Sequence, residues 1–148
     1  MVWGGQDRKD LQGEYFTEAC DFALHWYDKR PLLYQHGLDS QLKSSAVGVI
    51  DRIQADEIGL WAEAQLDLKD AVMPARFKSL IEAGQLHFSS ASIPHLVDIA
   101  EDGQIKRWPI VEGSLTPHPA EPYHTNVLSL KSARAACGLA EANPLKNF

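Results

Sequence analysis

A regular alternation of apolar and polar residues over Leu60–Leu68 constrains the fold of this chain more than any other feature. The apolar residues at its even-numbered positions share one face of a strand, whereas Trp61 and Glu63 face the opposite way. The turn-forming residues Asp56–Gly59 precede it, and Ser45–Ile53 before the turn also repeats with a period near two. The sequence therefore predicts a two-stranded hairpin over these two segments.

Several other short segments have the composition of strands. Leu32–Tyr34 is apolar, Leu86–Ile93 combines apolar residues with serines, and Ile105–Leu115 is a strand region that Pro109 and Gly113 interrupt. Two less regular segments, Cys20–Trp26 and His95–Ile99, are also expected to be strands, and Glu101-Asp102-Gly103 is expected to be a hairpin turn.

One segment has the spacing of a helix instead. It begins at Met73-Pro74, carries Phe77, Leu80 and Ile81 on one side, and ends at Gly84, so a helix of about ten residues is expected. Strands, one helix and then more strands predict an α+β or mainly β domain, built as a small barrel with surrounding helices.

The length of 148 residues suits one domain, which we place at residues 1–127. Residues 128–148 form a tail, and its alanine-rich part, Leu128–Ala142, could be a helix. The polar segment Met1–Gly13 is expected to be poorly ordered. No apolar run approaches the ~20 residues of a membrane helix, and the first residues lack the features of a signal peptide. We therefore expect an intracellular protein with no membrane partner.

Charge and cysteine content narrow the function classes further. The net charge is -6 and the basic residues are dispersed, which argues against nucleic acid as a partner. Cys20 and Cys137 lie far apart and outside any CxxC pair, so both are expected to be reduced thiols. The six histidines show no spacing typical of a metal site, with His87 and His95, and His118 and His124, as the closest pairs. No metal and no cofactor are expected.

Three segments carry residues of the types that an acyl-transfer site requires. His36 ends an apolar strand, a cluster at Ser89, Ser90 and Ser92 lies in another, and Glu112 is a carboxylate in an otherwise apolar region. Serine needs a neutral imidazole to accept its proton, and the imidazole needs a third group to orient it. Pairing with His36 would satisfy Glu112, although an ion pair with Lys106 or Arg107 would do so equally well.

Taken together, these segments resemble the prohead proteases of tailed bacteriophages. The resemblance spans about Asp10–Val127 and depends on the order and spacing of its pieces. These are Asp10–Glu14, Leu32–Gly37, Val47-Gly48, Glu57–Leu60, Ala83-Gly84, Phe88–Ser92 and Glu112–Ala120.

The resemblance implies a fold similar to that of the herpesvirus assembly protease, a mostly antiparallel barrel with helices around it. It implies a serine endopeptidase with His36 as base, Ser89 as nucleophile and Glu112 as the acidic third member. The expected substrates are the scaffold and major capsid proteins of a phage head, cleaved inside the procapsid in the host cytoplasm. The chain would also cleave itself near Ala135–Leu139, and the herpesvirus relatives imply a homodimer as one assembly state.

Two departures from the family pattern leave alternatives open. Many members have glycine where this chain has Ala91, and Ser90 becomes the nucleophile if the register shifts by one residue. Backbone N–H groups near Ser90 and Ala91 are the expected oxyanion donors, with Arg107 either assisting them or forming a surface ion pair. A catalytically inactive module that binds capsid or scaffold protein is the alternative function.

Overall fold

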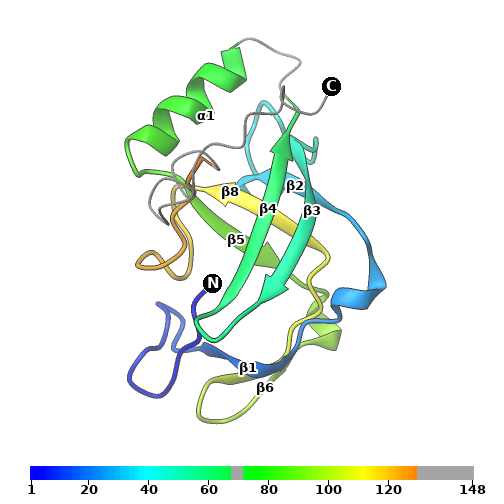
Figure 1. Ribbon diagram of the computed structural model, residues 1–148, viewed down its shortest axis with the longest axis vertical. Coiled ribbons are helices and arrows are strands. Elements are labelled where there is room, and N and C mark those ends of the chain that lie inside the picture. The colour runs from blue at the N-terminus through cyan, green and yellow to red at the C-terminus, as the bar shows by residue number, and fades with distance from the viewer. Residues whose placement is uncertain (68–71, 130–148) are drawn as a thin grey trace, which may run out of the picture.

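The computed structural model describes residues 1–67 and 72–129 of the chain. Most of the described secondary structure is strand, accompanied by one α-helix and three short 3-10 turns (Figure 1). The strands are β1 (Tyr15–Asp21), β2 (Arg30–Tyr34), β3 (Gly48–Ala55), β4 (Leu60–Leu66), β5 (His87–Ala91), β6 (Asp98–Ile99), β7 (Gln104–Arg107) and β8 (Glu112–Thr116). The helix is α1 (Val72–Glu82), and the 3-10 turns are η1 (Leu24–Trp26), η2 (Gln35–Gly37) and η3 (Pro94–Leu96).

The strands form two sheets. A five-stranded sheet in the order β4-β3-β2-β8-β5 curls into a half-barrel, with α1 near one end and the sheet β1-β7-β6 near the other (Figure 1). The mixed α+β, strand-rich class predicted from the sequence is confirmed at this level. The arrangement is less uniformly antiparallel than expected, because β2 pairs with β8, and β1 with β7, in parallel.

The predicted hairpin is present as β3 and β4. Ile53 pairs with Ala62 and Ala55 with Leu60, and the Asp56 carboxylate accepts the backbone N–H groups of Ile58 and Gly59 in the turn. Leu60 is buried as the alternation predicted, but Ala62 is exposed. The reason is that β4 is an edge strand, so its apolar face is covered only in part.

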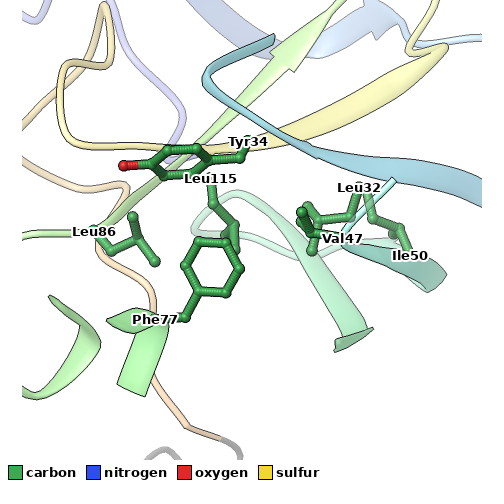
Figure 2. Close-up of a cluster of buried hydrophobic side chains, with 7 residues drawn as sticks. All are labelled: Leu32, Tyr34, Val47, Ile50, Phe77, Leu86 and Leu115. Atoms are coloured by element: carbon green, nitrogen blue, oxygen red, sulfur yellow. The ribbon is translucent and has the colours of Figure 1, made fainter. Parts of the chain in front are cut away.

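The main core lies between α1 and the concave side of the five-stranded sheet. Figure 2 shows Phe77 pointing from α1 toward Leu115, with the Tyr34 ring alongside; the Tyr34 and Phe77 ring centroids are 5.4 Å apart. Burying a side chain of this size stabilises the fold by about 1.5–3 kcal/mol. The full cluster comprises Leu32, Tyr34, Val47, Ile50, Phe77, Leu86 and Leu115.

Helix α1 ends as the sequence predicted. Gly84 has φ +64, the Gln85 N–H donates to the Leu80 carbonyl, and the Gly84 N–H donates to the Ile81 carbonyl. This is the Schellman arrangement, in which a left-handed residue after the helix satisfies its last carbonyl groups. The turn leads directly into β5, which carries the serine cluster.

Three local predictions were wrong. Of Cys20–Trp26 only the first two residues are in a strand, because β1 ends at Asp21 and the chain turns at Ala23, which has a positive φ and precedes η1. His95–Ile99 begins in the turn η3 and is strand only over the two residues of β6. Met1–Gly13 is ordered, since Val2 forms a β-bridge with Gly59 and Trp3 stacks on Phe22.

Arg30 lies at the start of β2 and is only 4% exposed. Its guanidinium donates to the carbonyls of Ile110 at 2.6 Å, Tyr27 at 2.9 Å and Leu24 at 3.1 Å. These hydrogen bonds connect the irregular segment between β1 and β2 to the segment that leads into β8. The arginine therefore replaces the backbone pairing that a regular strand would have supplied.

Two expectations concern residues outside the described part of the chain. The helix expected within Leu128–Ala142 and the cleavage expected near Ala135–Leu139 both fall mostly or wholly within residues 130–148. Within residues 1–67 and 72–129, no helix has the length and apolar character needed to cross a bilayer.

Candidate active site

His36 and Glu112 form a close pair at one end of the five-stranded sheet. The His36 Nδ1 atom lies 2.8 Å from Glu112 Oε1, and their side chains are 33% and 15% exposed. The parallel pairing of β2 and β8 makes this possible, because it aligns Leu32 with Gly113 and Tyr34 with Leu115. Glu112 therefore contacts His36, and neither Lys106 nor Arg107 is its partner.

The backbone around His36 is unusual. Gln35, His36 and Gly37 all have positive φ values, of 48°, 53° and 76°. A left-handed conformation costs a residue with a Cβ atom roughly 1–2 kcal/mol, so surrounding contacts must hold the two non-glycine residues in place. With this backbone conformation, the His36 imidazole lies in contact with Glu112.

Ser114 supplies one of those contacts. The backbone N–H of His36 donates to Ser114 Oγ at 2.7 Å, and the same hydroxyl donates to the Leu33 carbonyl at 3.4 Å. Ser114 is fully buried. Its hydroxyl thus joins β8 to the turn that carries the imidazole.

Ser89 lies directly opposite Ser114 in the β5–β8 ladder, and Ala91 lies opposite Glu112. Residues in direct register share a face of the sheet and have Cβ atoms about 4.5–5.5 Å apart. Ser89 therefore shares its face with Glu112 and Ser114, the two residues that contact His36. The Ser89 hydroxyl makes no hydrogen bond within the described part of the chain.

Ser90 lies on the other face of β5, opposite Gly113. Its hydroxyl accepts a hydrogen bond from Trp108 Nε1 at 3.1 Å. Its backbone N–H points away from β8, because the N–H of Phe88, two residues earlier, donates outward to the Thr125 carbonyl at 2.7 Å. Ala91 is the next residue along the strand, so its backbone N–H and C=O groups point the other way, toward β8.

Arg107 belongs to a different surface. Its Nε atom lies 3.3 Å from Asp21 Oδ2, and its guanidinium lies over the Trp26 ring at 5.8 Å from the centroid. It is not among the residues that line the cavity described next. The structure thus brings together His36, Glu112, Ser89, Ser90 and Ala91, and leaves Arg107 apart.

A cavity of about 360 Å³ opens beside these residues. His36, Ser89 and Ser90 line it, together with residues from the N-terminal segment and from the segment 118–121. The volume falls within the range of about 300–1,000 Å³ that is usual for ligand pockets. Ser89 and His36 thus border the same cavity.

Sequence reasoning missed Ser114 and the N-terminal wall of the cavity. A signal for Ser114 exists, because Glu112, Ser114 and Thr116 alternate as polar residues along one face of β8. The N-terminal wall has no such signal, since its polar composition is equally typical of a mobile end. Across residues 1–67 and 72–129, no group of three or more His, Cys, Asp or Glu side chains is arranged to hold a metal ion.

Comparison of the chain with protein-family models, with curated proteins and with solved structures gave no significant match.

Proposed function

We propose that this protein is a serine endopeptidase with Ser89 as nucleophile, His36 as general base and Glu112 as the group that orients the base. The observation that carries the proposal is the 2.8 Å contact between His36 and Glu112, on the face of the sheet that also presents Ser89 to the cavity. A carboxylate on Nδ1 selects the tautomer whose Nε2 is free to accept a proton. That is the tautomer that a serine nucleophile requires.

The steps follow from these roles. His36 accepts the Ser89 hydroxyl proton as the serine oxygen attacks the peptide carbonyl, and then donates it to the departing amine. Water hydrolyses the resulting acyl-enzyme with His36 as base again. Glu112 stabilises the imidazolium in both stages. Register favours Ser89 over Ser90, because the Ser90 hydroxyl lies on the opposite face and is bonded to Trp108.

The oxyanion formed during attack needs donors that point toward it. The Ser90 backbone N–H is the better candidate, since it lies outside the β5–β8 ladder at a residue that lines the cavity. Ala91 directs its N–H toward β8 and is a weaker candidate. The ion pair of Arg107 with Asp21 favours a surface role for that arginine.

The biological setting in the proposal comes from the sequence motifs. Their resemblance to prohead proteases implies cleavage of scaffold and major capsid protein inside a phage procapsid, in the host cytoplasm, by a barrel like that of the herpesvirus assembly protease. The curled, strand-rich sheet is compatible with such a barrel. A homodimer remains part of this proposal.

A second candidate is a binding module of the same fold that docks to capsid or scaffold protein without cleaving it. The observation in its favour is that the Ser89 hydroxyl is not hydrogen-bonded to His36. Catalytic hydrogen bonds are often long in the absence of substrate, so this geometry is compatible with both candidates.

A fluorophosphonate probe separates the two candidates. The wild-type chain should be labelled at Ser89, labelling should be absent in Ser89→Ala, and it should persist in the matched variant Ser90→Ala. Peptide mapping by mass spectrometry identifies the labelled residue. Labelling that survives in Ser89→Ala and is lost in Ser90→Ala would move the nucleophile to Ser90, and a wild-type chain that is never labelled would favour the binding module.

A further inference from the structure

The cavity beside Ser89 is lined by more negative than positive side chains. Three carboxylates line it, those of Asp10, Glu14 and Glu121, against the single guanidinium of Arg8. Arg8 is exposed and makes no ion pair with any described residue. The imidazoles of His36 and His118, the phenol of Tyr15 and the N-terminal ammonium of Met1 are the other ionisable groups in the lining, and the Met1 ammonium is attracted to Glu121.

The three carboxylates differ in what they already bind. Asp10 Oδ1 accepts the backbone N–H groups of Gln12 and Glu14, at 2.8 and 2.9 Å. Glu121 accepts the backbone N–H groups of Tyr123 and His124, at 3.0 and 2.9 Å. The Glu14 carboxylate makes no hydrogen bond and no ion pair with any residue the structure describes. Glu14 is therefore the acidic group left free to bind a ligand.

The surroundings of Glu14 disfavour its negative charge. Partial burial, and then the charge of Asp10, raise the pKa of the Glu14 carboxyl above its ordinary value. Two neighbouring carboxylates repel each other, and a cation placed beside them removes that repulsion. The uncompensated charge thus favours a cationic ligand.

The rest of the lining is apolar. Phe16, Ile105 and Trp108 contribute, and the Phe16 and Trp108 rings meet edge to face with centroids 5.8 Å apart. Lysine and arginine combine a hydrocarbon stem with a charged end, so they are complementary to a cavity with apolar and acidic surfaces.

The walls of the cavity are held in place by backbone hydrogen bonds. The Asp10 N–H donates to the Glu14 carbonyl at 2.7 Å, and the Leu11 N–H donates to the Ala120 carbonyl at 3.0 Å. The second bond joins the N-terminal wall to the wall formed by residues 118–121. The backbone that carries Asp10 and Glu14 is therefore already held in place when a charged group enters, which lowers the entropic cost of binding.

We propose that this cavity selects peptide substrates by a lysine or arginine side chain, with Glu14 as the residue that recognises its charge. The inference rests on the proposed peptidase function and identifies the substrate class of the same site. Glu14 acts in binding and has no part in the proton transfers at Ser89 and His36.

The test uses sets of three peptides that differ at one residue, which is lysine, its uncharged isostere norleucine, or glutamate. The varied residue is placed in turn at each of the four positions before the scissile bond. At one position the wild-type chain should cleave the lysine peptide at least about tenfold faster in kcat/KM than the norleucine peptide. Glu14→Gln should reduce that ratio to below about threefold, and Glu14→Lys should invert the preference toward glutamate. Glu101→Gln, an exposed change of equal charge in the β6–β7 turn, should leave the ratio unchanged.

Binding of the same peptides to the Ser89→Ala variant, measured by fluorescence polarisation, separates the selectivity from the chemistry. The inference is supported if the chain binds lysine peptides more tightly and Glu14→Gln removes that preference. If this result is found but no peptide is cleaved, only the peptidase proposal fails. Equal affinity for lysine and norleucine peptides at every position, or a lysine preference that Glu14→Gln leaves intact, overturns the inference. Thermal unfolding of each variant verifies that it is folded.

Discussion

The backbone N–H of His36 donates a 2.7 Å hydrogen bond to the hydroxyl of Ser114, the residue directly opposite Ser89 in the neighbouring strand. Ser114 thus contacts the backbone of the proposed base and is the cross-strand neighbour of the proposed nucleophile. It holds the left-handed turn against β8 and is not among the residues that line the cavity, so in the proposed mechanism Ser114 is a positioning residue.

Replacing Ser114 with alanine tests this relationship. The change leaves the His36 N–H without its acceptor, which should lower the free energy of unfolding by about 1–3 kcal/mol. The rate of fluorophosphonate labelling at Ser89 should fall as well, because the turn is no longer held and the imidazole loses its alignment. Labelling kinetics and urea unfolding measure the two effects.

Phe77→Leu in helix α1 is the control for Ser114→Ala, because it destabilises the core and leaves the hydrogen bond between the His36 N–H and Ser114 in place. It should reduce stability by a comparable amount and leave labelling in the folded protein unchanged. Equal losses of labelling in the two variants would mean that Ser114 acts through stability alone.

Glu112→Gln tests the third member of the site. The amide retains a hydrogen-bonding group near His36 Nδ1 but loses the charge that stabilises the imidazolium, so kcat should fall by about 10²- to 10⁴-fold. Glu63→Gln is the matched control, since Glu63 forms an exposed ion pair with Arg52 at 3.5 Å. Peptide hydrolysis under saturating substrate measures kcat, and a loss below about threefold in Glu112→Gln would contradict the assigned role.

Arg30→Met tests the buried guanidinium. Its removal leaves the carbonyls of Tyr27, Leu24 and Ile110 without their donors, so the free energy of unfolding should fall by about 2–4 kcal/mol. Arg52→Met, at an exposed position, should change it by less than about 0.5 kcal/mol. Chemical denaturation of both variants provides the comparison, and similar values for the two would exclude the proposed structural role.

Cys20 gives a prediction about pH. Burial, followed by the charge of Asp21, raises the pKa of its thiol to about 12 in the folded chain, whereas an unfolded cysteine titrates near ~8.5. Above that lower pKa the unfolded chain loses the thiol proton and the folded chain retains it. This group should therefore lower the free energy of unfolding by about 1.4 kcal/mol per pH unit between about pH 9 and 11.

The measurement compares unfolding of the wild-type chain and Cys20→Ala across this pH range, both in a Cys137→Ser background. The difference between the two should change with pH at the stated slope. The buried thiol should also resist iodoacetamide at pH 8 until the protein unfolds. Rapid alkylation of the native chain would show that the thiol is accessible.

Patterns within one segment predicted the local structure well. The β3–β4 hairpin and helix α1 follow from alternation, turn residues and the glycine at the helix end, all of which act between neighbours in the chain. Cys20–Trp26 was misassigned because its loose alternation is overridden by the tertiary hydrogen bonds of Arg30, which no local pattern reveals.

The site was predictable in part. Chemistry indicated that Glu112 would need a partner, with His36 as one candidate beside Lys106 and Arg107, and the contact with His36 is present. The parallel pairing of β2 with β8 was not predictable, because it joins strands separated by most of the fold. The contribution of Asp10 and Glu14 to the cavity was missed for the same reason, since it depends on the docking of the N-terminal segment against residues 118–121.

The parallel pairing of β2 with β8 also determines when the site can exist. His36 and Glu112 are 76 positions apart, and β3, β4, α1 and β5 to β7 all intervene between them. Contacts of such long range form late in folding, after the entropy of closing a large loop has been overcome. A nascent chain released only as far as β7 has His36 but not Glu112 to orient it, so the proposed hydrolytic activity would be delayed until synthesis has passed β8.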